Sequence, residues 1–353
     1  MKEFDYIIRG GGCAGLSLAY QMEISGILIN KTCAIIETRS EYKRDKTWSF
    51  WKTSNHNFED CIKKEWSKFS IKIPNKIKTI DCNEIPYQTI DSGLFYNKIL
   101  QKLEQNQNVE FFANEEKINL KNSLVFNSVP NLNKNHGIWQ HFGGLEIETE
   151  VDSFDEKTLD LMDFDCDQHH AVHFFYILPF SKKNALIETT WLSDMNDRST
   201  LDYEQQLINY IQKKLGIKKY KINFDEKGAI PLFYANNRNL NNVINIGTAG
   251  KMTRLSTGYT FLNIQDHSKF IVSNLDNPRK LTNYIIPKKY NFLDNIFLKV
   301  LNKNPETMPE IFYNMFDAPN KSVIKFLSNK SNILEDLDII LKMPKVLFLK
   351  NII

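Results

Sequence analysis

Residues 4–37 constrain the fold of this chain more than any other stretch, because a glycine pattern stands there between two apolar runs. The first run, 6–8, leads into Gly10-x-Gly12-x-x-Gly15, and a helical pattern follows from Cys13 to about residue 23. The first glycine allows a tight turn, the second lets the backbone approach a pyrophosphate, and the third allows close packing of helix on strand. The helix N-terminus offers free N–H groups and a partial positive charge to phosphates.

The second apolar run, 33–36, ends on Glu37, where a carboxylate accepts hydrogen bonds from a ribose. Strand, glycines, helix, second strand and terminal acid therefore predict a dinucleotide site. Its expected contact residues are Gly10, Gly12, Cys13, Ala14, Gly15 and Glu37. A glycine-rich turn in an ordinary α/β protein is the alternative.

The composition narrows the classes of function. The 353 residues suit two interleaved domains, and the net charge of +3 comes from scattered lysines, so no nucleic-acid partner is expected. Five cysteines lack CxxC spacing and the histidines lack metal-ligand spacing, which favours a reducing cytoplasm and no metal.

The chain opens on a strand and not on a signal peptide. No apolar run approaches the ~18 residues of a membrane span, so any membrane contact is expected to be peripheral.

Later segments divide the chain into three parts. Residues 1–60, 91–130 and 240–275 are predicted to form a discontinuous Rossmann-type domain, with a helix at 91–103. Residues 61–90 and 131–239 are rich in strand formers and predict a mainly antiparallel sheet that carries a substrate. Residues 276–353 predict several helices. A buried strand at 242–246 precedes a second glycine-rich loop, whose expected ligand contacts are Gly247, Thr248, Gly250, Thr257 and Gly258.

The motifs taken together resemble the bacterial lycopene cyclases. They occur in family order over nearly the whole chain: DYIIRGGGCAGLSLA at 5–19, DKTWSFW at 45–51, WQHFGGLEIET at 139–149, LMDF at 161–164, FFYILPFS at 174–181, ALIETTWLS at 185–193, GAIPL at 228–232, INIGTAGKMTRLSTGYTFLNIQ at 244–265 and FLDNIFLKVL at 292–301.

The resemblance implies a flavoprotein that closes β-ionone rings on the ends of lycopene, or of a related carotenoid. It implies an FAD domain with an inserted substrate sheet and a helical C-terminal part. It also implies FAD kept reduced by NAD(P)H, no net redox change, and a place on a membrane surface. Lys251 and Leu255 differ from the family pattern, which has a second glycine and a proline there. Arg9 stands in the last position of the first strand, where an aliphatic residue is usual in the dinucleotide motif.

Cyclising a polyene end requires a strong proton donor in a dry pocket, so the donor is expected to be a buried carboxylic acid with a raised pKa. Glu188 lies between apolar residues in a strand-like run, and in the resembling family the acid of this motif is the essential one. An outward-facing position on an alternating strand is the alternative. Glu226 is a second acid, a base or a solvated charge, and Asp45 either orients ligand or caps a turn.

Aromatic faces stabilise cations, and a carotenoid needs a long apolar slot. The expected wall residues are Trp48, Trp51, Trp139, Tyr176 and Trp191, with core packing as the alternative for each. Phe175 and Tyr176 cannot share a face of a regular strand. In the tail, apolar residues interspersed with lysines suit either an interfacial segment or a packed helix.

Two further readings remain open from the sequence. One is a redox flavoenzyme of the same fold, such as a hydroxylase or prenyl reductase. The other is an inactive relative with a degraded flavin site, suggested by Arg9, Lys251 and Leu255. Ring type, the number of rings formed, nicotinamide preference and oligomeric state are not predicted.

Overall fold

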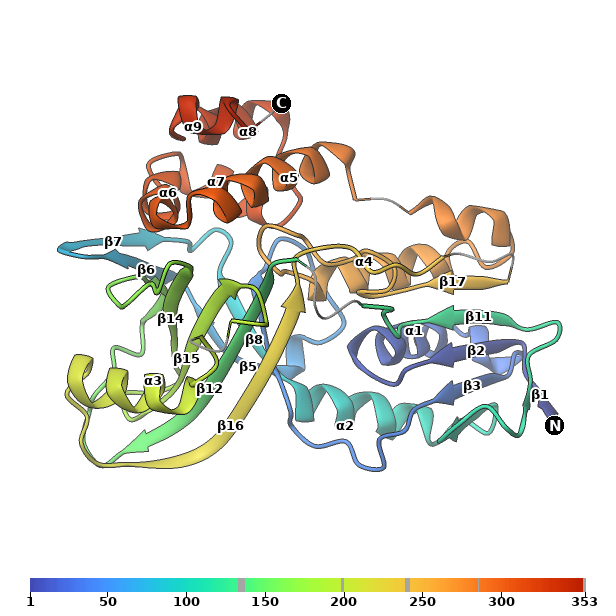
Figure 1. The fold of residues 1–353 in the computed structure, drawn as a ribbon. Helices are drawn as coiled ribbons and strands as arrows, with labels where there is room; N and C mark the ends of the chain where they lie inside the picture. Colours follow the sequence, from blue (N-terminus) through green and yellow to red (C-terminus); the bar gives the residue numbers. More distant parts are fainter. Residues whose placement is uncertain (133–136, 198–199, 239–241, 285, 352–353) are drawn as a thin grey trace.

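The computed structural model describes residues 1–353 except 133–136, 198–199, 239–241, 285 and 352–353. Figure 1 shows a small parallel sheet with its helices on one side, a larger twisted sheet on the other, and a group of helices above the larger sheet. The predicted boundary at 239/240 and the last two residues of the predicted tail lie outside the described residues.

The five-stranded sheet is entirely parallel, in the order β17-β11-β2-β3-β9. Its strands are β2 (Tyr6–Arg9), β3 (Cys33–Ile36), β9 (Val109–Phe112), β11 (Leu124–Asn127) and β17 (Val243–Asn245). One face packs against the apolar sides of α1 (Cys13–Ile24), α2 (Ser92–Leu103) and α4 (Phe261–Val272). This is the predicted Rossmann-type arrangement, and Asp91 caps α2 by accepting from the N–H groups of Gly93 and Leu94.

The seven-stranded sheet has the order β16-β12-β15-β14-β13-β6-β7, and all its pairs are antiparallel except β13 with β6. Its strands are β6 (Lys68–Ile73), β7 (Lys76–Asp81), β12 (Trp139–Thr149), β13 (Thr158–Asp163), β14 (Val172–Pro179), β15 (Asn184–Ser193) and β16 (Tyr220–Pro231). α3 (Tyr203–Asn209) and a π-helical turn (Tyr210–Lys214) cover one face, with Leu207, Tyr210 and Ile211 in the shared core.

A three-stranded sheet joins the two parts: β4 (Thr47–Trp51), β8 (Tyr87–Asp91) and β5 (Ile62–Trp66). The C-terminal helices are α5 (Lys288–Lys303), α6 (Met308–Met315), α7 (Asn320–Leu327), α8 (Ile333–Ile340) and α9 (Lys345–Leu349). Short elements complete the chain: β1 (Lys2–Glu3) pairs with β10 (Ile118–Asn119), and 3-10 turns occur at Ile27–Ile29, Glu59–Cys61, Pro278–Asn283 and Pro305–Thr307.

The predicted fold class is confirmed: a Rossmann-type α/β part, an inserted mainly antiparallel sheet and a helical C-terminal part. Within the described residues, no helix combines the length and apolar character needed to cross a membrane.

Candidate active site

A cavity of about 450 Å³ lies where the two large parts of the molecule meet. One end touches the glycine loop before α1, through Gly12, Cys13 and Ala14, and the loop before α4. The other end reaches Phe312 and Met315 on α6 and Leu327 on α7. The wall between them is the face of the seven-stranded sheet opposite α3, the face on which the C-terminal helices also pack. The cavity therefore connects a nucleotide-binding loop to an apolar slot.

The first glycine loop has the geometry that its pattern predicts. Gly10 has a φ of +90°, which favours glycine, and a Cβ on Gly15 would stand 1.9 Å from the carbonyl oxygen of Gly10. A Cβ on Gly12 would meet no atom within 4 Å, so the backbone there is open to the cavity. Glu37 accepts from the N–H groups of Gly11 and Arg39, at 2.9 and 3.0 Å, and so holds the loop.

The second glycine loop packs on the first. Gly247 has a φ of +59°, and a Cβ there would lie 2.6 Å from the Cβ of Ala14. Thr248, Thr257 and Gly258 line the cavity, whereas Gly250 lies against the backbone of Asn245, where a Cβ would stand 2.4 Å from its carbonyl oxygen. Gly250 is therefore placed as a packing glycine.

The cavity end near these loops fits a dinucleotide flavin. Neither α1 nor α4 has a side-chain cap or an acidic residue in its first turn, so both N-termini offer N–H groups toward the cavity. A buried hydroxyl in the cavity wall, Ser256 Oγ, also has no hydrogen-bond partner within the described part of the chain. Donors of this kind suit a polar ligand such as FAD.

Glu188 and Glu226 form a buried carboxyl pair. Tyr176 on β14, Glu188 on β15, Gly144 on β12 and Glu226 on β16 pair with one another in one row across four adjacent strands. A Cβ on Gly144 would stand 2.8 Å from Cγ of Glu188, so the glycine leaves the space in which the two acids meet. Their carboxyl groups lie close enough that the charge of Glu226 raises the pKa of Glu188.

The surroundings raise the pKa of Glu188 more strongly than that of Glu226. Burial, and then the charge of Glu226, raises the pKa of Glu188 well above its usual value. Burial also raises the pKa of Glu226, but its Oε2 accepts from the Thr47 N–H at 2.8 Å and Arg44 favours its charged form. Because Glu188 lines the cavity, a carboxyl group with a raised pKa faces any ligand bound there.

Three tyrosines line the cavity beside this pair. Tyr176 donates to the hydroxyl of Tyr87 at 3.0 Å, which lies 3.5 Å from that of Tyr259. Burial raises the pKa of all three, in the case of Tyr259 to about 12, so their rings stay neutral. Trp48 lines the cavity at the loop end, with its ring 5.8 Å from that of Phe261.

The other three expected wall residues lie elsewhere, which corrects the prediction for them. Trp191 is on the opposite face of β15 from Glu188, stacked on His173 at 3.8 Å with its N–H bonded to Gln206. Trp139 packs on Phe233, and Trp51 is buried against Phe69 and Tyr87. Each fills a core position. Trp139 and Trp191 do so because adjacent strand positions face opposite sides of the sheet, and Gln140, Thr190 and Leu192 beside them line the cavity.

Asp45 is placed beside the cavity and not in its wall. Its Oδ1 accepts from the hydroxyls of Ser92 and Tyr96, both at 3.1 Å, and Oδ2 lies 3.5 Å from Arg39. Asp45 therefore ties the start of β4 to α2.

The residues that differ from the family pattern point away from the cavity or are paired. Lys251 has a φ of +65°, the conformation for which glycine is favoured, and its ammonium lies 5.3 Å from the ring centre of Tyr234. Arg9 forms a two-bond ion pair with Glu115, and Leu255 is buried.

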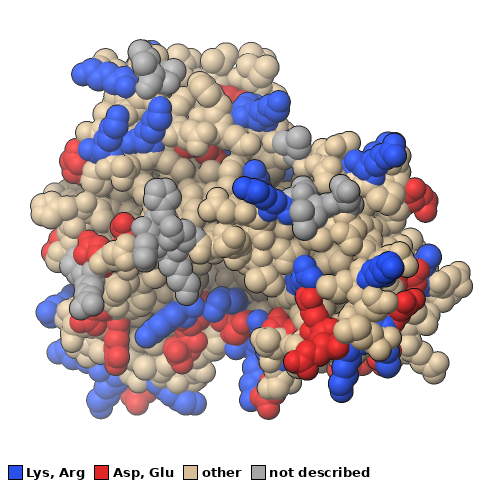
Figure 2. Space-filling model, turned by 45° about the vertical axis from the view of Figure 1, so that its right-hand side comes forward, with Lys and Arg blue, Asp and Glu red and all other residues tan. Residues whose placement is uncertain are grey.

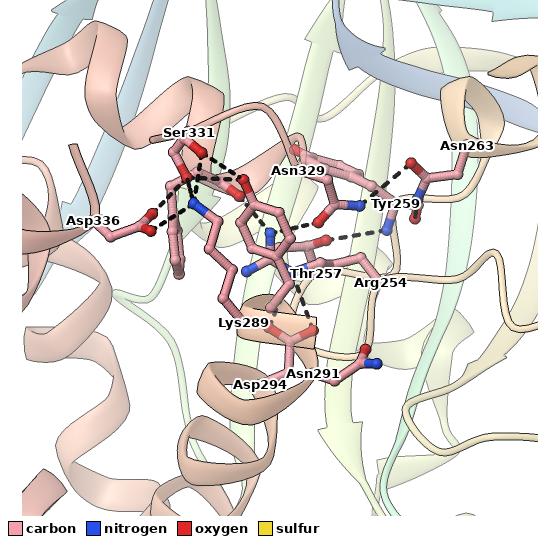
Figure 3. A network of polar contacts seen from close by, with 12 residues as sticks. Arg254, Thr257, Tyr259, Asn263, Lys289, Asn291, Asp294, Asn329, Ser331 and Asp336 are labelled. Atoms are coloured by element: carbon pink, nitrogen blue, oxygen red, sulfur yellow. Dashed lines mark hydrogen bonds and ion pairs between the residues drawn. The ribbon is translucent and has the colours of Figure 1, made fainter. Parts of the chain in front are cut away.

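Arg254 is a structural residue of the site that the sequence did not single out. Figure 3 shows its fully buried guanidinium between the loop before α4 and the C-terminal helices. Its Nε lies 2.9 Å from Asp294 of α5, and its Nη1 donates to Asn329 at 2.8 Å and to the carbonyl of Phe326. Its backbone carbonyl accepts from Gly258 at 2.8 Å. Arg254 thus fixes the cavity loop to the helices above it.

Comparison with known proteins shows which family has a sequence pattern like that of this chain. The sequence pattern of the family described as "Lycopene cyclase protein" matches residues 5–351. The chain is 25% identical over 292 residues to the chloroplastic neoxanthin synthase of Solanum lycopersicum, and 24% over 293 residues to that of Solanum tuberosum. Each match covers 73% of this chain and 57% of the plant protein, so the chain spans a little over half the length of these relatives.

Solved structures agree on the fold. A geranylgeranyl bacteriochlorophyll reductase-like protein from Thermoplasma acidophilum superposes over 100% of both chains with a TM-score of 0.71 at 13% identity. The flavin-dependent brominase Bmp2 gives 0.61 at 12% identity, covering 93% of this chain and 94% of that one. The p-nitrophenol 4-monooxygenase of Pseudomonas putida gives 0.58 at 12%, covering 99% and 98%. The fold is that of the FAD-dependent oxidoreductases.

Proposed function

The chain belongs to the lycopene cyclase protein family, and we propose that it cyclises the acyclic ends of lycopene to β-ionone rings, with FAD held in its reduced state by NAD(P)H. The observation that carries the proposal is the buried Glu188 carboxyl in the wall of a mainly apolar cavity, where burial raises its pKa well above the usual value. The relatives named as neoxanthin synthases support a carotenoid as the ligand class.

The proposed reaction is an isomerisation. Glu188 gives its proton to the terminal double bond, a C–H bond forms, and the resulting cation closes a C–C bond to the next double bond. The Glu188 carboxylate then takes a ring proton, so protons and electrons balance. Trp48 and Tyr176 would present aromatic faces to the cation, and reduced FAD, held by the loops before α1 and α4, would supply an electron-rich ring.

FAD is expected to occupy the loop end. The backbone at Gly12 and Ala14, the N-termini of α1 and α4, and the side chains of Ser256 and Thr257 would hold it there. Peripheral association with a membrane from the cytoplasm is part of the proposal, because the ligand is a lipid.

Replacing Gly12 by valine tests the flavin site. The new side chain meets no protein atom at Cβ and projects into the open space of the cavity, so the fold should remain intact while FAD binding weakens at least tenfold. Flavin absorbance after reconstitution and the thermal midpoint measure the two effects. In contrast, Gly15→Ala should lower the midpoint itself, because its Cβ collides with the Gly10 carbonyl. Unchanged FAD affinity in Gly12→Val would contradict the assigned loop.

The rate should depend on pH through Glu188. Burial and the charge of Glu226 raise its pKa, so Glu188 keeps its proton at neutral pH, and activity should fall as pH rises through that raised pKa. Turnover measured between pH 6 and 10, with flavin reduction held constant, gives the profile. A rate that increases over the whole range would exclude a carboxylic acid as the donor.

Gly144→Ala tests the carboxyl pair. The added methyl should push the Glu188 side chain away from Glu226, lower turnover about tenfold, and move the alkaline limit of activity to lower pH, because Glu188 loses the neighbouring charge. Gly143→Ala is the matched control: its Cβ would stand 2.7 Å from Cβ of Tyr203 on the other face, so it should cost stability and leave the pH limit unchanged. If the alkaline limit of activity did not shift in Gly144→Ala, the charge of Glu226 would not be what raises the pKa of Glu188.

A further inference from the structure

Helix α8 turns its apolar side chains toward solvent. Ile333, Leu334, Leu337, Ile340 and the following Leu341 are between 43% and 74% exposed. Their spacing of three, four and seven residues places them on one side of the helix, which we term the outer face of α8. A helix on a protein surface normally buries such a stripe, so the outer face is an unpartnered apolar surface.

The acidic residues of α8 point the opposite way, into the protein. Glu335 pairs with Lys325 at 2.5 Å, and Asp336 pairs with Lys289 at 2.6 Å. Asp338 accepts from the hydroxyl of Ser322 at 3.2 Å. The acidic side chains of α8 therefore face the protein, and its apolar side chains face solvent.

The neighbouring segment adds positive charge to this surface. Val346 and Leu349 of α9 are 68% and 61% exposed, and Lys342, Lys345 and Lys350 are exposed beside them. Among the residues that the structure describes, no carboxylate lies within ion-pair distance of these three lysines. Figure 2 shows the upper part of the molecule, where α8 and α9 lie, as mostly uncharged with blue side chains, while red side chains gather mainly in the lower half.

We propose that the outer face of α8, with Val346, Leu349 and the three lysines, docks on a lipid bilayer that carries anionic headgroups. An apolar side that enters the acyl boundary and cations at headgroup level are the two elements of interfacial binding. The lysines complement anionic lipid, whereas a second copy of the chain would bring the same positive charge to the contact.

The position of this surface connects it to the cavity, and this part of the inference rests on the proposed function. α8 packs on α7, whose Leu327 lines the apolar end of the cavity. Asp336 of α8 bonds to Ser331 (Figure 3). Tyr290 of α5 also bonds to Ser331, and its ring lies 4.5 Å from the Arg254 guanidinium. The docking surface is therefore linked through α7 to the cavity end by which we expect a membrane-dissolved carotenoid to arrive.

Vesicle flotation with the full chain tests the proposal. The protein should float with vesicles of phosphatidylcholine and phosphatidylglycerol, and less with phosphatidylcholine alone. The double variant Leu334→Asp, Leu341→Asp should bind at least tenfold more weakly. Replacing Lys342, Lys345 and Lys350 by glutamine should remove the preference for anionic vesicles and its dependence on salt.

The matched control is the double variant Val151→Asp, Ile222→Asp. It adds the same charges at exposed apolar positions, one in the connection between β12 and β13 and one on β16. This variant should bind vesicles like the wild type. Vesicle binding by the α8 variant equal to that of the wild type would overturn the proposal. So would wild-type protein that does not bind vesicles but forms a dimer in light scattering that the α8 substitutions abolish. Vesicle binding needs no turnover, so a protein that docks as described but leaves lycopene unchanged would refute the proposed function alone.

Discussion

Replacing Glu188 by glutamine is expected to lower cyclisation by about 10³-fold while the protein still folds and binds FAD. Glutamine keeps the shape and the hydrogen-bonding capacity toward Glu226 but has no acidic proton to give. Among the described residues that line the cavity, Glu188 is the only carboxylic acid, and Glu226 lies in the same row of the sheet on the far side of Gly144. Turnover of lycopene with reduced flavin measures the effect.

Glu148→Gln is the control for Glu188→Gln. Glu148 is exposed on β12 of the same sheet and should tolerate the change at wild-type rate. A Glu188→Gln protein that retained more than a tenth of wild-type turnover would remove Glu188 from the proposed role.

Replacing Arg254 by methionine is expected to cost about 3–5 kcal/mol of unfolding free energy, because the carboxylate of Asp294 would remain buried without its partner. The guanidinium also bonds to Asn329 and lies 4.5 and 4.7 Å from the ring centres of Tyr290 and Phe326, so further contacts are lost. Urea unfolding of both proteins gives the difference.

The double variant Arg254→Met, Asp294→Leu is the matched control, because it removes both charges together. It should recover part of the lost free energy, since a buried ion pair can be replaced by apolar groups at little cost. If the single and double variants were equally unstable, the ion pair would not be the cause. A single variant as stable as wild type would show that the buried network is dispensable.

The local patterns of the chain predicted the parallel sheet and its glycine loops well. The glycines, the helix and the strands around residues 4–37 are contiguous, so their geometry follows from short-range rules, and β2, α1 and β3 lie where expected. The acid at Glu188 was found in the same way, since its apolar flanks indicate burial.

Trp191 shows what the local sequence pattern failed to predict, since it was expected in the cavity wall and is buried behind the sheet. Glu188 and Trp191 are three positions apart on one strand, and an odd separation places them on opposite faces. That rule, applied to Phe175 and Tyr176, agrees with the structure: Tyr176 lines the cavity and Phe175 stacks on Tyr210 behind the sheet. The same rule extended to Trp191 would have excluded it from the wall.

Long-range pairing accounts for the rest. The role of Gly144 depends on β12 lying between β15 and β16, which the order of the strands in the chain does not reveal. Likewise Arg254 meets Asp294 and Asn329, 40 and 75 residues further along the chain, and a lone arginine in a loop carries no sign of such partners.

The most direct test of the central claim is cyclisation of lycopene by the purified protein in D₂O with reduced FAD. Acid catalysis from Glu188 predicts cyclic product that carries one solvent deuteron per ring by mass spectrometry, with NAD(P)H consumed only to reduce the flavin. Product without deuterium, formed with one NAD(P)H oxidised per molecule, would contradict the account and identify a redox flavoenzyme.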